Sequence, residues 1–341
     1  MVSRHRVVDH IIAQLAASGI EYIFGVDGAN IEDLYDAAFV SDDITAILAK
    51  HEFSAATMAD GYSRAVSRIG VVAATSGGGS LNLVAGLGES LASRVPVLAL
   101  VGQAPTGMDG RGSFQDTSGR SGSLDAVALF SAVSVYCRRV TEPQDIVPAL
   151  AEALAAADSG GPAVLLLPKD IQQATIDAVN PVAAVQDSLL ADPGPIAEVL
   201  RRALGPVTII AGEQVARDDA RRELEELRSV LRAWVATVPD AKDVSGSPGL
   251  GQSSWLGVTG VMGHPRVVDA VSRSAVCLVV GTRLSVTARA GLDGALAGVQ
   301  TVSLGAERPY VPSTHVNSTN LRASLTALTR SLTGAGRPPS A

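Results

Sequence analysis

A carboxylate stands where an apolar stretch of the sequence ends. Residues 44–48 form a short apolar run that predicts a buried strand, and the segment KHEFSAATMADGYSR, residues 50–64, follows it directly. Burial of a carboxylate costs free energy unless its surroundings compensate, so Glu52 is a candidate for chemistry. The alternative is that Glu52 only begins the following helix, where the helix dipole favours a negative charge.

The glycine-rich segment TSGGGSLN, residues 75–82, is a second candidate. Consecutive glycines allow backbone N–H groups to approach an anion such as a phosphate at the start of a helix. The segment matches neither the P-loop pattern nor G-x-G-x-x-G. A tight turn between a strand and a helix is therefore the alternative interpretation.

The elements that position these residues alternate between strand and helix, which is typical of an α/β fold. Short apolar runs predict the strands, and apolar residues three and four apart predict the helices. The predicted strands are residues 22–26, 44–48, 70–74, 95–101 and 163–167, and the predicted helices are residues 7–18 and 143–157. This alternation predicts an α/β protein of two doubly wound domains with mainly parallel sheets.

The alternation weakens after residue 174 and restarts near residue 196. Prolines and the lack of a clear period predict a linker over residues 175–195. The first domain is then residues 1–174, and the second is residues 196–331. In the second domain we expect strands at residues 207–211, 234–238, 277–280 and 299–304, and a helix at 218–231. The tail, residues 332–341, is expected to be disordered.

Four segments follow predicted strands of the first domain, and ligands of open α/β sheets bind beyond the carboxyl ends of strands. The segments are FGVDGAN (24–30), KHEF (50–53), TSGGGSLN (75–82) and GQAPTGMDGRGSFQDTSG (102–119). We expect them to meet at one edge of one sheet. Five glycines within residues 107–122 predict a mobile loop that orders when the site is completed.

Composition excludes several classes of function. The 341 residues are 47% hydrophobic and carry a formal net charge of −7. Without a cluster of Lys and Arg, a nucleic-acid surface is not expected. Cys137 and Cys277 stand alone, so neither a disulfide framework nor a zinc site is indicated. No signal peptide or membrane span is recognisable, and we expect a cytoplasmic protein that binds no membrane.

Together, the four segments resemble the pyrimidine-binding (PYR) domain of thiamine-diphosphate-dependent enzymes, particularly the acetolactate synthase group. The family motifs are F-G-x-P-G, R-H-E-x-x-A-x-x-M-A-x-G-Y-A-R, T-S-G-P-G-x-x-N and G-Q-x-P followed by F-Q-E. This chain has FGVDG, KHEFSAATMADGYSR, TSGGGSLN and GQAP with SFQD, in the same order. Residues 205–229 and 255–271 resemble the family's central domain more loosely, so the resemblance runs from residue 5 to about residue 310.

The resemblance implies a role for each candidate. Glu52 would hydrogen-bond the aminopyrimidine of thiamine diphosphate, which then removes the proton from its own reactive carbon. Gln115 is implied to be catalytic with Glu52, and Phe114 to face the substrate. The implied cofactor-binding residues are Val26, Asp27, Gly28, Thr75, Gly78 and Asn82.

Two of these positions depart from the family pattern. Asp27 and Gly78 each stand where the family usually has proline. Asp27 adds a carboxylate near the site, which casts doubt on the usual apolar substrate pocket. Gly78 loosens a turn.

The family holds the diphosphate and Mg²⁺ through a G-D-G…N motif in a further domain, which this sequence does not show. GLDG at residues 291–294 mimics the motif, but Leu292 breaks it. Hard cations need converging oxygen ligands, so we expect no metal site here and expect a separate subunit to hold Mg²⁺, in a heterotetramer. Residues 299–309 lack the acidic strand end that nucleotide-binding members often show, which argues against FAD.

Two functions remain open. One is a subunit of a split enzyme that decarboxylates a 2-oxo acid and transfers the acyl carbanion to an acceptor carbonyl, an acetolactate synthase-like carboligation. The other is a truncated or degenerate homologue with a non-catalytic binding or regulatory role. The intact H-E motif and the F-Q loop favour the split enzyme. An unrelated nucleotide-binding α/β protein would need a phosphate fingerprint that the sequence does not contain.

Overall fold

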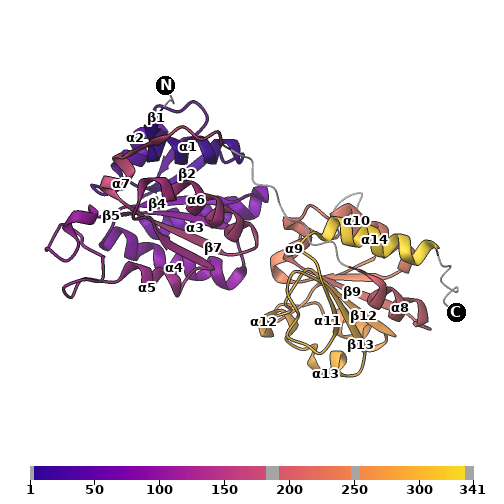
Figure 1. Cartoon of the computed structure of the whole chain (residues 1–341). Coiled ribbons are helices and arrows are strands. Elements are labelled where there is room, and N and C mark those ends of the chain that lie inside the picture. The colour runs from indigo at the N-terminus through magenta and orange to yellow at the C-terminus, as the bar shows by residue number, and fades with distance from the viewer. Residues whose placement is uncertain (1–3, 182–191, 247–253, 335–341) are drawn as a thin grey trace. The chain divides into compact units, whose positions relative to one another are not determined.

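The computed structural model describes residues 4–181, 192–246 and 254–334. The chain divides into two compact units, residues 1–186 and 187–341 (Figure 1). Each unit contains one six-stranded parallel sheet, so the predicted fold class is confirmed. Residues 182–191 of the predicted linker and residues 335–341 of the predicted tail lie outside the described residues.

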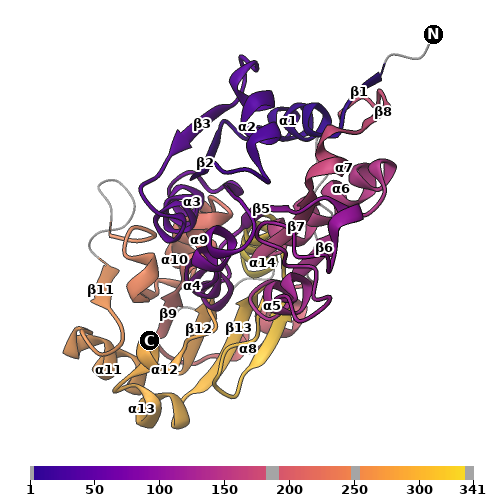
Figure 2. The same ribbon diagram turned by 90° about the vertical axis from the view of Figure 1, so that its left-hand side faces the viewer.

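In the first unit the strand order is β3-β2-β4-β5-β7-β6, running from one edge of the sheet to the other (Figure 2). The strands are β2 Tyr22–Val26, β3 Thr45–Leu48, β4 Gly70–Ala74, β5 Val97–Gln103, β6 Tyr136–Arg139 and β7 Pro162–Pro168. A separate antiparallel pair joins β1 Arg4–Arg6 to β8 Thr175–Asp177. The five strands predicted from the sequence are all present.

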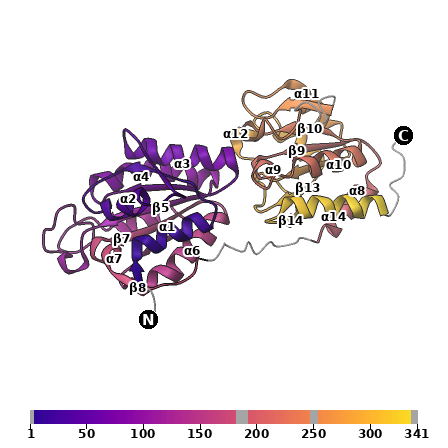
Figure 3. The same cartoon turned by 90° about the horizontal axis from the view of Figure 1, so that it is seen from above.

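Helices cover both faces of this sheet (Figure 3). One face packs against α1 Val7–Ala17, α2 Glu32–Phe39 and α6 Ile146–Asp158, and the other against α3 Glu52–Val66, α4 Gly78–Ser93 and α5 Ala126–Ser131. Alternate strand residues enter opposite cores, as Val71 and Val72 of β4 do. The short elements are η1 Thr106–Met108, η2 Pro143–Asp145 and α7 Lys169–Gln173.

Three strands of the first unit, β1, β6 and β8, are missing from the sequence prediction. β6 has the sequence YCRR, and its two arginines obscure the apolar signal of an edge strand. Both arginines are paired with carboxylates, which allows them to lie on the sheet. β8 falls inside the predicted linker, because three residues are too few to show an alternating pattern.

In the second unit the strand order is β11-β10-β9-β12-β13-β14. The strands are β9 Val207–Ala211, β10 Trp234–Thr237, β11 Trp255–Val258, β12 Val276–Val280, β13 Gln300–Gly305 and β14 Thr314–Asn317. The helices are α8 Gly194–Arg202, α9 Glu213–Arg217, α10 Arg221–Leu231, α11 Pro265–Ser272, α12 Val286–Arg289, α13 Asp293–Ala297 and α14 Leu321–Gly334, with η3 Pro239–Ala241. Four of these strands were predicted; β11 and β14 were not.

The predicted helix at residues 218–231 is shorter than expected. Asp219 has φ +48°, a left-handed conformation that a continuous helix cannot contain, and α10 begins only at Arg221. The Asp218 carboxylate instead accepts a hydrogen bond from the backbone N–H of Leu321 at 2.8 Å, at the start of α14. α14 itself runs into the predicted tail as far as Gly334.

Candidate active site

The candidate site lies at the carboxyl ends of β2 and β4, where the strand order of the first sheet reverses. These strands are parallel neighbours, and Val26 at the end of β2 pairs with Ala74 at the end of β4. The crevice outside such a reversal is where open α/β sheets bind ligands. The structure therefore brings the segments that follow β2 and β4 to one edge.

Glu52 is the first residue of α3, but it does not cap that helix. The cap is His51, whose Nδ1 accepts a hydrogen bond from the backbone N–H of Phe53 at 3.1 Å. Oε2 of the half-buried Glu52 carboxylate accepts a hydrogen bond from the side-chain amide of Asn82, on α4, at 2.9 Å. Because His51 satisfies the helix start, the Glu52 carboxylate is available for another partner.

Glycines leave space beside the Glu52 carboxylate. A Cβ atom on Gly79 would lie 3.1 Å from Glu52 Oε1 and 2.8 Å from Thr75 Cγ2. A Cβ atom on Gly28 would also lie 2.8 Å from the Thr75 side chain. At Gly78, in contrast, a Cβ atom would meet nothing within 4 Å. Thr75 and its glycine neighbours are thus closely packed, next to open space at the start of α4.

The turn between β4 and α4 is tight, as the alternative interpretation of the glycine-rich segment predicted. Gly77 has φ +63°, and a Cβ atom there would lie 2.8 Å from the Cβ of Gln115. The Gln115 side chain lies on this turn, and its Oε1 accepts long hydrogen bonds from Ser76 Oγ at 3.4 Å and Thr75 Oγ1 at 3.5 Å. Phe114 is 71% exposed.

Asn30 connects the segment after β2 to the β4–α4 turn and to the loop that carries Phe114. It was not singled out from the sequence. Its side-chain amide donates to Ser76 Oγ at 2.7 Å and, more weakly, to the backbone oxygen of Phe114 at 3.5 Å. Its backbone N–H donates to Thr75 Oγ1 at 3.2 Å. Gln172 then holds the Asn30 carbonyl oxygen at 2.8 Å. A buried asparagine after a strand end was the available signal, because such a side chain needs hydrogen-bond partners.

Two carboxylates set the electrostatics of this edge. Burial raises the pKa of Tyr35 above its usual value, and the negative charges of Asp27 and Glu52 raise that pKa further. Both carboxylates are therefore within electrostatic reach of one phenol. Asp27 itself is exposed, and its Oδ1 accepts a hydrogen bond from the backbone N–H of Gly28 at 2.7 Å.

Two family models match the chain in the order of its two units. The model of the thiamine pyrophosphate enzyme N-terminal TPP binding domain matches residues 5–123. The model of the thiamine pyrophosphate enzyme central domain matches residues 195–305. The chain belongs to the thiamine pyrophosphate enzyme family.

The chain is also similar in sequence to curated acetolactate synthase large subunits. A probable acetolactate synthase large subunit of Methanocaldococcus jannaschii is 33% identical over 287 residues, which cover 81% of this chain and 46% of that protein. The acetolactate synthase large subunit of Corynebacterium glutamicum is 29% identical over 282 residues, which cover 80% of this chain and 43% of that protein. The acetolactate synthase isozyme 2 large subunit of Escherichia coli is 28% identical over 278 residues, which cover 80% of this chain and 48% of that protein. The chain thus spans about half the length of these relatives.

The candidate residues fit the pyrimidine end of thiamine diphosphate, the cofactor of this family. Glu52 would offer one carboxylate oxygen to a ring nitrogen, while its other oxygen is held by Asn82. Gly79 keeps a side chain away from Glu52 Oε1, and Gly78 leaves the adjoining space open. The structure brings Glu52, Asn82, Thr75, Gly28 and Gln115 together; the individual roles stay predictions.

Val26, Asp27 and Phe114 are less closely tied to this group. Val26 is half-buried at the end of β2, whereas Asp27 and Phe114 are exposed.

Metal ligands do not gather in the described part of the chain: residues 4–181, 192–246 and 254–334 contain no group of three His, Cys, Asp or Glu side chains placed to hold an ion. Over the same ranges, every helix is too short or too polar to cross a membrane.

Proposed function

We propose that the chain is a subunit of a thiamine-diphosphate-dependent enzyme that decarboxylates a 2-oxo acid and transfers the acyl group to an acceptor carbonyl, an acetolactate synthase-like carboligation. The observation that carries the proposal is the half-buried Glu52 carboxylate, which does not cap its helix, is held by Asn82 and has Gly79 next to Oε1. In this proposal the Glu52 carboxyl group would exchange a proton with the pyrimidine of the cofactor.

Glu52 would hold and return a proton at its oxygen Oε1. Asn82 can only donate through its side-chain nitrogen, so its hydrogen bond to Oε2 orients the carboxyl group and leaves Oε1 for a ring nitrogen. Thiamine diphosphate, when bound, supplies the carbon nucleophile that attacks a carbonyl group and accepts the electron pair released on decarboxylation. Gln115 and Phe114 would contact the carbonyl substrate from the loop that reaches the β4–α4 turn.

We further propose that a separate subunit with the G-D-G…N motif binds the diphosphate and Mg²⁺, and that two copies of each chain form a heterotetramer. Exposed apolar side chains next to the site support an interface there. Phe53 is 44% exposed, Met58 37% and Leu81 42%, and they lie on α3 and α4. Apolar surface of this kind marks interaction sites, and permanent interfaces bury more than about 2,000 Å².

Co-expression with candidate G-D-G…N subunits tests the function. The purified complex, loaded with thiamine diphosphate and Mg²⁺, is offered a panel of 2-oxo acids and carbonyl acceptors. We expect release of CO₂ and a coupled product only when both chains are present. A complex that assembles and binds the cofactor but turns over no member of the panel would favour a non-catalytic binding role instead.

A further inference from the structure

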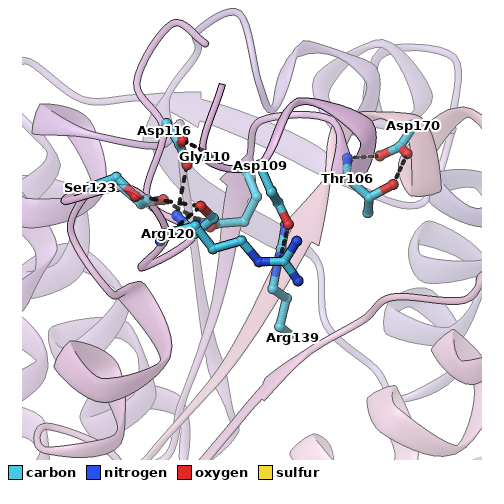
Figure 4. Close-up of polar contacts among 11 residues, drawn as sticks. Thr106, Asp109, Gly110, Asp116, Arg120, Ser123, Arg139 and Asp170 are labelled. Carbon is cyan, nitrogen blue, oxygen red and sulfur yellow. Dashed lines mark hydrogen bonds and ion pairs between the residues drawn. The ribbon is translucent and has the colours of Figure 1, made fainter. Parts of the chain in front are cut away.

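A buried ion pair ties the loop that carries Phe114 and Gln115 to the edge of the sheet. Arg139, the last residue of β6, donates from Nη1 and Nη2 to the two carboxylate oxygens of Asp109, both at 2.8 Å (Figure 4). The side chain of Asp109 is only 5% exposed and that of Arg139 15%. A bidentate pair fixes orientation as well as distance, so Asp109 is held firmly at the base of the loop.

A second carboxylate, that of Asp116, links the backbone next to Asp109 to the backbone next to Gln115. Asp116 accepts a hydrogen bond from the backbone N–H of Gly110 at 2.9 Å (Figure 4). It also accepts one from the backbone N–H of Ser118 at 2.9 Å. Gly110 follows Asp109 directly, and Asp116 follows Gln115 directly. The loop is therefore closed into a ring whose one side is fixed by Arg139 and whose other side carries Phe114 and Gln115.

The conformation of Gln115 requires such a hold. Gln115 has φ +57°, a left-handed conformation that a residue with a side chain adopts only when its surroundings enforce it. Its own side-chain contacts with Thr75 and Ser76 are long, at 3.5 and 3.4 Å and therefore weak. The constraint has to come from the rest of the loop.

We propose that Asp109 and Arg139 are positioning residues that hold Phe114 and Gln115 against the β4–α4 turn. The effect of this pair on the reaction, through Gln115 and Phe114, rests on the proposed function. The order of the loop itself does not depend on that function. The two parts can therefore be tested separately.

Hydrogen exchange on the full chain tests the hold. Arg139→Gln removes the guanidinium group that makes both hydrogen bonds to Asp109. Arg139→Lys keeps the charge without the bidentate geometry. We expect exchange in peptides covering residues 107–122 to become at least about tenfold faster in Arg139→Gln and to rise less in Arg139→Lys. Peptides from β4 and β7 should be unchanged.

Arg138→Gln is the matched control. Arg138 lies next to Arg139 on the same strand, but it pairs with Asp145 and Glu152, away from the loop. Its loss should leave exchange in residues 107–122 as in the natural chain. Equal exchange in Arg138→Gln and Arg139→Gln would overturn the proposal.

A kinetic readout separates positioning from simple stabilisation. In the assembled enzyme, Arg139→Lys should raise KM for the carbonyl substrates or lower kcat by about tenfold per active site. A pair that only stabilised the fold would lower the melting temperature and the active fraction and leave both constants unchanged. Unchanged constants with a loosened loop would refute the positioning role. If no assembled complex is active, the proposed function fails, and the exchange comparison still decides whether the pair holds the loop.

Discussion

The two units have sheets of the same architecture, but the polar side chains at the carboxyl edges of these sheets differ. In the first, the half-buried Glu52 carboxylate lies beside Gly79, where a Cβ atom would come within 3.1 Å of Oε1. In the second, the order reverses between β9 and β12, and Gln214 fills that point. Its amide donates to the Ser318 carbonyl at 3.0 Å and to Asp218 Oδ2 at 3.1 Å, and its Oε1 accepts from the Ala306 N–H at 2.9 Å.

The two edges therefore differ in where their polar groups are directed. Gln214 ties together the segments that follow β9, β13 and β14, so the polar groups at the second edge bind one another. At the first edge Asn30 plays a similar bridging part, but Glu52 is left with an oxygen for a ligand. The doubly wound fold supplies the crevice in both units, and the side chains after the strands decide whether it is open for chemistry.

The largest effect should come from Glu52→Gln. This change keeps the shape of the side chain and removes its ionisable proton, so activity of the assembled enzyme should fall by about 10²–10⁴-fold. The melting temperature should stay the same, because His51 and not Glu52 caps α3. Glu142→Gln, an exposed residue outside the site, is the control. More than about a third of the activity remaining in Glu52→Gln would refute the role.

Gly79→Ala tests whether the space at the first edge is needed. Its methyl group would approach Glu52 Oε1 and the Thr75 side chain, so binding of thiamine diphosphate to the complex should weaken by at least about tenfold. Gly88→Ala is the matched control, because Gly88 lies on the same helix with nothing within 4 Å of its Cβ position. That control should raise stability by about 0.5–1 kcal/mol. Calorimetry and thermal melting measure the two effects, and equal affinity in both variants would contradict the account.

Gln214→Met tests the closed edge of the second unit. The substitution leaves the buried groups around Gln214 without their partners, at about 1–3 kcal/mol for each unsatisfied group. The second unit should melt at a lower temperature, while melting of the first unit is unchanged. Gln300→Met, at the exposed start of β13, is the control and should have little effect. If Gln214→Met melts like the natural chain, Gln214 does not hold the second edge together.

Glu213→Gln should have the smallest effect, and one that depends on pH. Burial raises the pKa of Glu213 above its usual value, so the folded chain binds this proton more tightly than the unfolded chain does. The free energy of unfolding therefore falls as pH rises from the usual Glu range through the folded pKa. Glu213→Gln removes this loss and should raise the melting temperature of the second unit near pH 7. The gain should disappear below about pH 4.5, the ordinary pKa of a Glu carboxyl; a gain that is the same at both pH values would contradict it.

Much of this architecture could be predicted from the sequence, because buried parallel strands such as β4 and β12 are continuous apolar runs. β6 could not, since its arginines look like solvent-facing residues until Asp109, Asp145 and Glu152 are placed beside them. Strand-end logic and family motifs pointed to Glu52, but only the structure shows that His51 caps the helix. The Asp109–Arg139 pair is separated by 30 positions in the chain, and no local pattern reveals it.

The most direct test of the central claim, that the first edge holds only one end of thiamine diphosphate, is a calorimetric titration of the cofactor with Mg²⁺. It compares the chain alone, a candidate G-D-G…N subunit alone, and the two together, with Glu52→Gln as a further sample. We predict tight binding only when both chains are present. The proposed role of Glu52 accounts for the pyrimidine end alone, and no group of metal ligands gathers within residues 4–181, 192–246 and 254–334. A submicromolar Kd for residues 1–341 alone would contradict the claim.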